Sequence, residues 1–112
     1  MTNKIYTIEE IKKIVQPIAK NYGVENVFLF GSYARGDADS NSDIDLRIDK
    51  GKIKGFFRLG SLYNELTEKL NKKIDLITTA SLDKVFLELI SSEEINIYSS
   101  QRMWLFCHQT IK

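Results

Sequence analysis

Two acidic side chains, Asp43 and Asp45, lie two residues apart in the segment Ser42-Asp43-Ile44-Asp45-Leu46. On a β-strand both would leave the same face, with their β-carbons roughly 6.5–7 Å apart. At an effective dielectric near 20 the two charges would repel each other by roughly 2–3 kcal/mol. A divalent cation such as Mg²⁺, which binds oxygen ligands and substrate phosphates together, would relieve that repulsion. For the pair taken alone, the alternative is the solvated face of an exposed strand.

A third carboxylate, Asp75, lies in the apolar setting Ile74-Asp75-Leu76. An unpaired carboxylate in such surroundings is costly, so Asp75 calls for a partner. If its strand neighbours the strand of Asp43 and Asp45, the three carboxylates converge. Such a cluster can hold two metal ions and assist an in-line displacement at phosphorus.

The stretch Gly31-Ser32-Tyr33-Ala34-Arg35-Gly36 ends an apolar run and opens a turn. Glycine at such a point lets the backbone approach a ligand closely, and amides at a helix start can bind phosphate. Arg35 follows Ser32 by about one helical turn, so both can face one ligand. The alternatives are an ordinary turn capped by Ser32 and a surface arginine that pairs with Asp37 or Asp39.

Other charged residues have two interpretations each. Arg47 and Asp49 share the carboxylate face, where they either contact phosphate and metal or pair with each other at the surface. The basic residues of two loops either reach a triphosphate or lie in solvent; these are Lys52, Lys54, Arg58, Lys72 and Lys73.

Helices and strands that could position these residues alternate along the chain. Thr7 with Glu10 three residues later predicts the start of a first helix, and Gly23 predicts its end. Further helices are predicted around residues 59–70 and after Ser81, the latter with an apolar face of Leu82, Val85, Phe86, Leu89 and Ile90. Apolar runs predict strands at residues 24–30, 42–49, 74–78 and 95–97. This alternation predicts an α/β or α+β fold with helices covering a sheet.

Composition narrows the class of protein. The 112 residues suffice for one compact domain, and a net charge of +1 argues against a domain that grips nucleic acid through many phosphates. The single cysteine, Cys107, excludes an internal disulfide. No apolar run approaches the roughly 20 residues that span a bilayer, so we expect a cytoplasmic protein.

The combined motif Gly-Ser-x-Ala-Arg-Gly followed by Ser-Asp-x-Asp-Leu resembles the signature of the minimal nucleotidyltransferases (MNT) of the DNA polymerase β-like superfamily. The resemblance extends over roughly residues 5–98, because the leading helix, the first strand and the strand of Asp75 are similar in order and spacing. It implies a small mixed sheet with helices packed on it, similar to the polymerase β palm.

The resemblance also implies roles. Gly31 and Ser32 would hold the phosphates of ATP, with Arg35 also assigned to nucleotide binding. Asp43 and Asp45 would bind Mg²⁺, and Asp75 would contact the metal on the acceptor side and help to activate a hydroxyl. Small chains of this type act as antitoxins that attach AMP to a tyrosine of a helical HEPN toxin, a ribonuclease, which would be the partner.

Size favours a protein acceptor independently, because a small acceptor normally needs a second wall to enclose it. We expect residues 1–98 to form the nucleotidyltransferase domain. Residues 99–112, with the apolar run 103–107, form a tail that could contact a partner or a second copy in a homo- or hetero-oligomer. Two alternatives stay open: an antitoxin that neutralises its partner by binding alone, and an enzyme acting on a small molecule such as an aminoglycoside.

Overall fold

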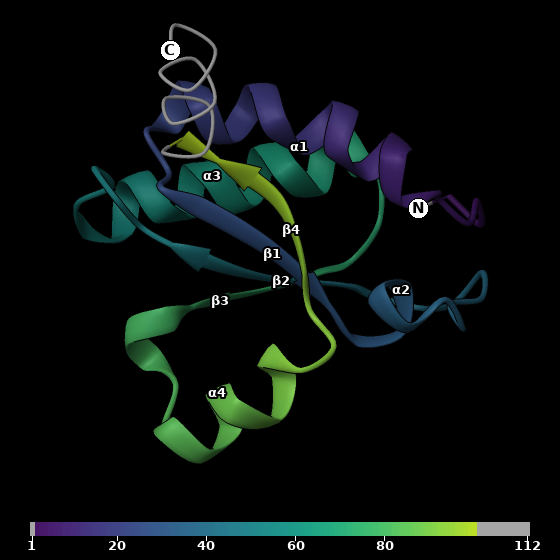
Figure 1. Cartoon of the computed structure of the whole chain (residues 1–112). Coiled ribbons are helices and arrows are strands. Elements are labelled where there is room, and N and C mark those ends of the chain that lie inside the picture. Colours follow the sequence, from purple (N-terminus) through teal and green to yellow (C-terminus); the bar gives the residue numbers. More distant parts are fainter. Residues whose placement is uncertain (1, 101–112) are drawn as a thin grey trace, which may run out of the picture.

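The computed structural model describes residues 2–100, in which helices and strands alternate as the sequence predicts (Figure 1). The elements are α1 (Ile8–Tyr22), β1 (Asn26–Phe30), α2 (Gly31–Arg35), β2 (Ile44–Asp49), α3 (Gly55–Leu70), β3 (Ile74–Thr78), the 3₁₀ turn η1 (Thr79–Ser81), α4 (Lys84–Ser91) and β4 (Ile95–Ser99).

The four strands form one mixed sheet in the order β3-β2-β1-β4. Strand β1 runs antiparallel to both of its neighbours, whereas β2 and β3 are parallel. A parallel pair needs a crossover connection, which α3 supplies. Helices α1 and α3 lie together on one face of the sheet, α4 lies on the opposite face, and α2 lies at one end (Figure 1). The predicted fold class, a small mixed sheet with helices packed on it, is confirmed.

The signals at the ends of α1 act as predicted. The hydroxyl of Thr7 accepts a hydrogen bond from the Glu10 amide, and the Glu10 carboxylate accepts one from the Thr7 amide. Gly23 ends the helix with φ of 76°, a left-handed conformation that glycine adopts without strain. The N-terminal helix is therefore set by local sequence.

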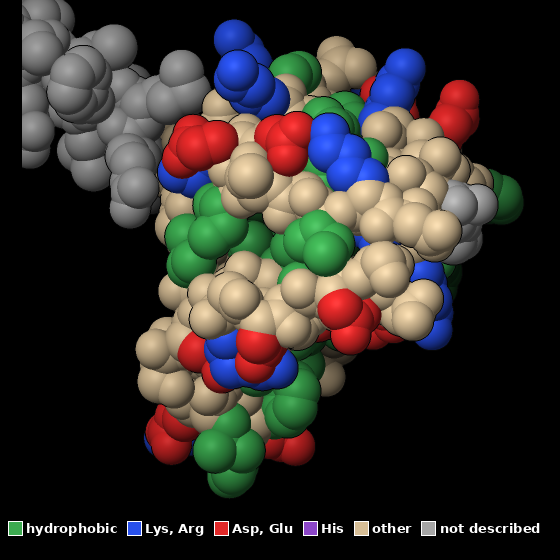
Figure 2. All heavy atoms as spheres, turned by 90° about the vertical axis from the view of Figure 1, so that its right-hand side faces the viewer, with side chains coloured by type: hydrophobic (Ala, Val, Ile, Leu, Met, Phe, Trp, Pro, Cys, Tyr) green, Lys and Arg blue, Asp and Glu red, His purple; other side chains and the backbone are tan. Residues whose placement is uncertain are grey.

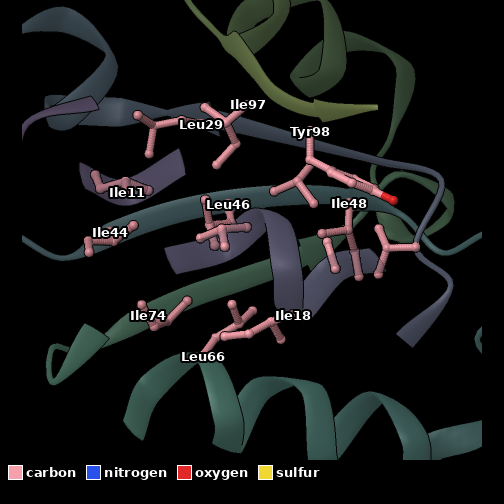
Figure 3. Close-up of a cluster of buried hydrophobic side chains, with 14 of the residues drawn as sticks. Ile11, Ile18, Leu29, Ile44, Leu46, Ile48, Leu66, Ile74, Ile97 and Tyr98 are labelled. Carbon is pink, nitrogen blue, oxygen red and sulfur yellow. The ribbon is translucent and has the colours of Figure 1, made fainter. Parts of the chain in front are cut away.

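The hydrophobic core lies between the sheet and the layer of α1 and α3 (Figure 3). From β2, Ile44, Leu46 and Ile48 point into this core and are fully buried. They pack with apolar side chains of α1 and α3 such as Ile11 and Leu66. Because side chains alternate along a strand, burying this set sends the charged residues of β2 to the opposite face.

Helix α4 departs from the prediction in two ways. Its N-cap is Asp83, whose carboxylate accepts a hydrogen bond of 2.8 Å from the Phe86 amide, whereas Ser81 lies in η1 and donates to the Thr78 carbonyl. Only one residue of its predicted apolar face, Ile90, is buried. Periodicity predicts an apolar stripe on a helix, but not whether another element covers it.

The predicted C-terminal tail falls almost entirely outside the described residues, and so does its apolar run 103–107. The division into a domain of residues 1–98 and a partner-contacting tail therefore stays a prediction. Within residues 2–100, no helix combines the length and the apolar character needed to cross a membrane.

Candidate active site

Asp45 and Asp75 face each other across two parallel strands. The pairing of β2 with β3 places Asp45 directly opposite Asp75. Burial raises the pKa of Asp45 from its ordinary value of 3.8 to about 6, assisted by a hydrogen bond with Asp75 and by repulsion from Asp75 and Asp43. Where neighbouring carboxylates disfavour each other's charge in this way, a divalent cation could stabilise the charged forms.

The apolar neighbours of Asp75 in the sequence predict an apolar environment for its side chain. The structure differs, because Asp75 is exposed. The reason is strand order: β3 is an edge strand, so the face of β3 that carries Asp75 has a neighbouring strand on one side only. The exposure leaves Asp75 accessible to a second substrate.

Asp43 lies in the turn just before β2, and its charge contributes to the raised pKa of Asp45. Its own carboxylate lies 3.6 Å from the ammonium group of Lys73. In the part of the chain that the structure describes, no three His, Cys, Asp and Glu side chains are close enough to hold a metal ion as they stand. The predicted convergence is therefore seen for Asp45 and Asp75, with Asp43 beside them and turned toward Lys73.

Gly31 lies against the Asp45 carboxylate. Phe30, the last residue of β1, pairs with Asp45, so the chain turns into α2 directly beside that side chain. Gly31 has φ of 73°, and a β-carbon added there would overlap the carboxylate of Asp45. No side chain caps the start of α2. The sequence predicts glycine here for the approach of a ligand, whereas the structure shows that it makes room for the Asp45 side chain.

We expect Gly31→Ala to reduce activity about 100-fold, because a side chain there displaces Asp45 and misplacements of about 1 Å have such effects. The left-handed backbone should add a stability loss of about 1–2 kcal/mol. Gly60→Ala is the matched control: it lies within α3, its added β-carbon meets nothing within 4 Å, and alanine favours a helix. Kinetics and urea unfolding of both variants test this, and equal behaviour of the two would contradict it.

Arg35 pairs with two carboxylates. Its guanidinium lies 3.3 Å from Asp37 and 3.3 Å from Glu93. The predicted alternative of a surface arginine bonded to Asp37 is therefore correct, and Glu93, 58 residues away in sequence, was not foreseen. Arg35 also opposes the raised pKa of Asp45, which places it within electrostatic reach of the carboxylates.

Lys72 holds the loop that leads to Asp43. It is only 3% exposed, and its ammonium group donates a hydrogen bond of 3.1 Å to the Ser40 carbonyl. The predicted alternative of a solvated Lys72 is therefore wrong, because its side chain is buried. Together with Asp43 and Lys73 it lines a cavity of about 180 Å³. Lys52 and Lys54, in contrast, follow the far end of β2, away from the carboxylates.

Arg47 is buried, so its predicted pair with Asp49 is present but does not lie at the surface. It is 6% exposed, its guanidinium bonds the Glu94 carboxylate at 2.5 Å, and it stacks on the Phe28 ring at 4.1 Å. Asp49 lies 3.6 Å from it but also accepts hydrogen bonds from Thr79 and Asn26. Glu94 is thus a buried partner of Arg47 that no local signal in the sequence indicates.

The raised pKa of Asp45 predicts a pH-dependent stability in the metal-free protein. Because the folded state binds this proton more tightly than the unfolded chain, its contribution falls as the pH rises from 3.8 to about 6 and is constant above. Since Asp45 is only partly buried, we expect a loss of about 1–2 kcal/mol. Urea unfolding with chelator across this range should show the loss for the wild type relative to Asp45→Asn. Parallel curves for the two proteins would contradict the prediction.

Comparison with known proteins shows which family the chain resembles in sequence. Residues 10–103 match the family described as Polymerase beta, Nucleotidyltransferase. A Methanocaldococcus jannaschii protein with the provisional name protein adenylyltransferase MJ0435 is 36% identical over 90 residues, which cover 80% of this chain and 97% of that protein. Protein adenylyltransferase MntA of Thermococcus cleftensis is 28% identical over 95 residues, covering 81% of this chain and 96% of that protein.

Solved structures agree on the fold. A structure provisionally described as a minimal nucleotidyltransferase has a TM-score of 0.70 at 25% identity, covering 80% of this chain and 95% of that chain. A complex of tri-AMPylated Shewanella oneidensis HEPN toxin with MNT antitoxin contains a chain with a TM-score of 0.64 at 19% identity, covering 93% of this chain and 83% of that chain.

The chain belongs to the polymerase β-type nucleotidyltransferase family and is of the minimal, MNT kind. By homology it is a protein adenylyltransferase, an enzyme that attaches AMP to a protein.

Proposed function

We propose that this chain transfers AMP from Mg²⁺-bound ATP to a tyrosine hydroxyl of a HEPN-type toxin and thereby acts as its antitoxin. The observation that supports this most is the pairing of Asp45 with Asp75 next to the backbone of Gly31. It brings two carboxylates and a helix start with no side-chain cap to one place on an open face. Relatives named as protein adenylyltransferases support the reaction, and the toxin complex of a structural neighbour supports the kind of partner.

The donor set suits Mg²⁺. The oxygens of Asp43, Asp45 and Asp75 are the hard ligands that this cation prefers. Burial and the neighbouring carboxylates raise the pKa of Asp45, which supports a need for positive charge at this position. When bound, Mg²⁺ would supply charge neutralisation at the phosphates. To join the other two carboxylates, Asp43 would leave its contact with Lys73.

The remaining groups would orient the nucleotide. The free amides of α2 and the Ser32 hydroxyl would bind phosphate oxygens, and Arg35 would leave Glu93 or Asp37 for the same purpose. The acceptor oxygen then forms a bond to the α-phosphorus while the bond to the β-phosphate oxygen breaks and pyrophosphate leaves. Asp75, which is exposed at the sheet edge, would accept the hydroxyl proton.

Incubation of the chain with ATP labelled in the α-phosphate, Mg²⁺ and the product of the neighbouring gene, which the proposal expects to be a HEPN-domain protein, tests the proposal. We expect label on that protein, removal of label transfer by chelator, and a modified tyrosine in peptide mass spectrometry. Absence of label, with inhibition of the toxin intact, would show neutralisation by binding alone and would overturn the proposal. Label on an aminoglycoside in place of the protein would overturn it as well.

A further inference from the structure

Helix α4 exposes most of its apolar side chains. Val85 is 68% exposed, Leu89 67% and Phe86 42%, whereas Ile90 is the only buried residue of the helix. Figure 2 shows hydrophobic side chains gathered at the lower end of the molecule, over α4. A surface helix normally turns its apolar stripe toward the core, and contiguous exposed apolar groups mark contact sites. The apolar face of α4 (Val85, Phe86 and Leu89) therefore lacks the cover that such a face usually has.

Ion pairs hold the C-terminal end of α4 on the carboxylate-bearing face of the sheet. In the turn after the helix, Glu93 pairs with Arg35 of α2 and Glu94 pairs with the buried Arg47 of β2. Arg47 leaves the same face of β2 as Asp45, two residues earlier. The helix is thus fixed beside the candidate active site by charged groups, and its apolar face is left free of the core.

The enzyme class indicates what covers this face. A protein adenylyltransferase must admit a folded protein to the carboxylates, and Asp75 is exposed on the side of the sheet where α4 lies. A protein substrate that brings its acceptor hydroxyl to these carboxylates would lie next to α4. Phe56 and Phe57 are also exposed, but they follow the far end of β2, away from the carboxylates.

We propose that the apolar face of α4 is the docking surface for the protein substrate, which contributes a complementary apolar patch beside its acceptor hydroxyl. This inference rests on the proposed function. The docked patch would cover Val85, Phe86 and Leu89, while the hydroxyl reaches the neighbouring carboxylates. Nucleotide binding would not depend on this surface.

Kinetics of two double variants test the proposal. Val85→Asp/Leu89→Asp places charge in the docking surface, and Lys84→Ala/Glu88→Ala alters the polar side of the same helix as the matched control. With the protein that the wild type labels as acceptor, we expect the first variant to raise the KM for that protein about 10–100-fold, as loss of a central apolar contact does. Its KM for ATP and the values of the control should stay within about twofold of the wild type. An unchanged KM for the protein in the folded aspartate variant would overturn the proposal.

A fluorescent reporter keeps the test independent of how the aspartates affect folding. Leu89→Cys in a Cys107→Ser background carries a polarity-sensitive dye at the centre of the docking surface. Adding the HEPN-domain protein should shift its emission to shorter wavelength, and no shift at saturating protein would overturn the proposal. A shift that depends on the concentration of this chain alone would assign the surface to a second copy and also overturn it. Failure of the proposed function is distinguished by absence of label transfer by the wild type, whereas failure of docking leaves that transfer intact.

Discussion

Asp45→Asn should lower AMP transfer at least about 1,000-fold while leaving the protein folded, because under the proposed function it removes a charge that would act directly on the reacting phosphates and their cation. Asparagine has nearly the same shape as aspartate, so Gly31 keeps its contact and the packing at the end of β1 is retained. The variant also removes the repulsion with Asp75 that raises the pKa of Asp45. In the metal-free protein at neutral pH it should therefore be as stable as the wild type or more stable.

The measurement is the rate of label transfer at saturating ATP, with unfolding curves for both proteins. Glu68→Gln is the matched control, since it neutralises an exposed carboxylate on α3, in the helical layer on the other side of the sheet. It should transfer AMP at the wild-type rate. Retention of more than about a tenth of the wild-type rate by Asp45→Asn would show that this carboxylate is not part of the reaction.

Glu94→Ala should destabilise the protein by about 3–5 kcal/mol, because it leaves the guanidinium of Arg47 buried without its main partner. The side chains of Arg47 and Glu94 are only 7% and 9% exposed, so water cannot readily replace the lost carboxylate. Thr79 and Asp49 remain near the guanidinium, which favours the lower end of this range. Urea unfolding at neutral pH measures the effect.

The double variant Arg47→Met/Glu94→Leu distinguishes the cost of leaving Arg47 unpaired from the contribution of the ion pair itself. Replacing a buried ion pair by apolar groups of similar volume is often neutral or stabilising, so this variant should unfold within about 1 kcal/mol of the wild type. A loss below about 1 kcal/mol for Glu94→Ala alone would mean that the pair is solvated. Because Glu94 also fixes the turn after α4, the single variant should in addition weaken protein docking more than ATP binding.

Under the two proposals, the two glutamates after α4 would connect the nucleotide side of the site with the docking helix. Glu93 holds Arg35, which the proposed function assigns to phosphate, and Glu94 holds the centre of β2. If ATP draws Arg35 away, one of these two anchors is released, and α4 remains attached through the buried Arg47. The helix that receives the protein substrate would thus keep its place during nucleotide exchange.

The sequence by itself determined the order of the helices and strands and the strand that carries Asp45. Thr7, Glu10 and Gly23 mark the ends of α1 through contacts within a few residues, and the alternation around Asp45 marks β2. These signals depend only on residues that are close together in the chain, so the sequence alone is enough to recognise them. The resemblance to the minimal nucleotidyltransferases rests on the same local motif.

Only the tertiary structure decided which groups meet and which remain open. Asp75 is exposed because β3 is at the sheet edge, and α4 keeps its apolar face uncovered because no element of the described chain packs there. The bond between Arg47 and Glu94 joins residues 47 positions apart. Periodicity tells which side of an element is apolar, but burial and pairing depend on strand order and on which distant segments pack together, and no local pattern carries that information.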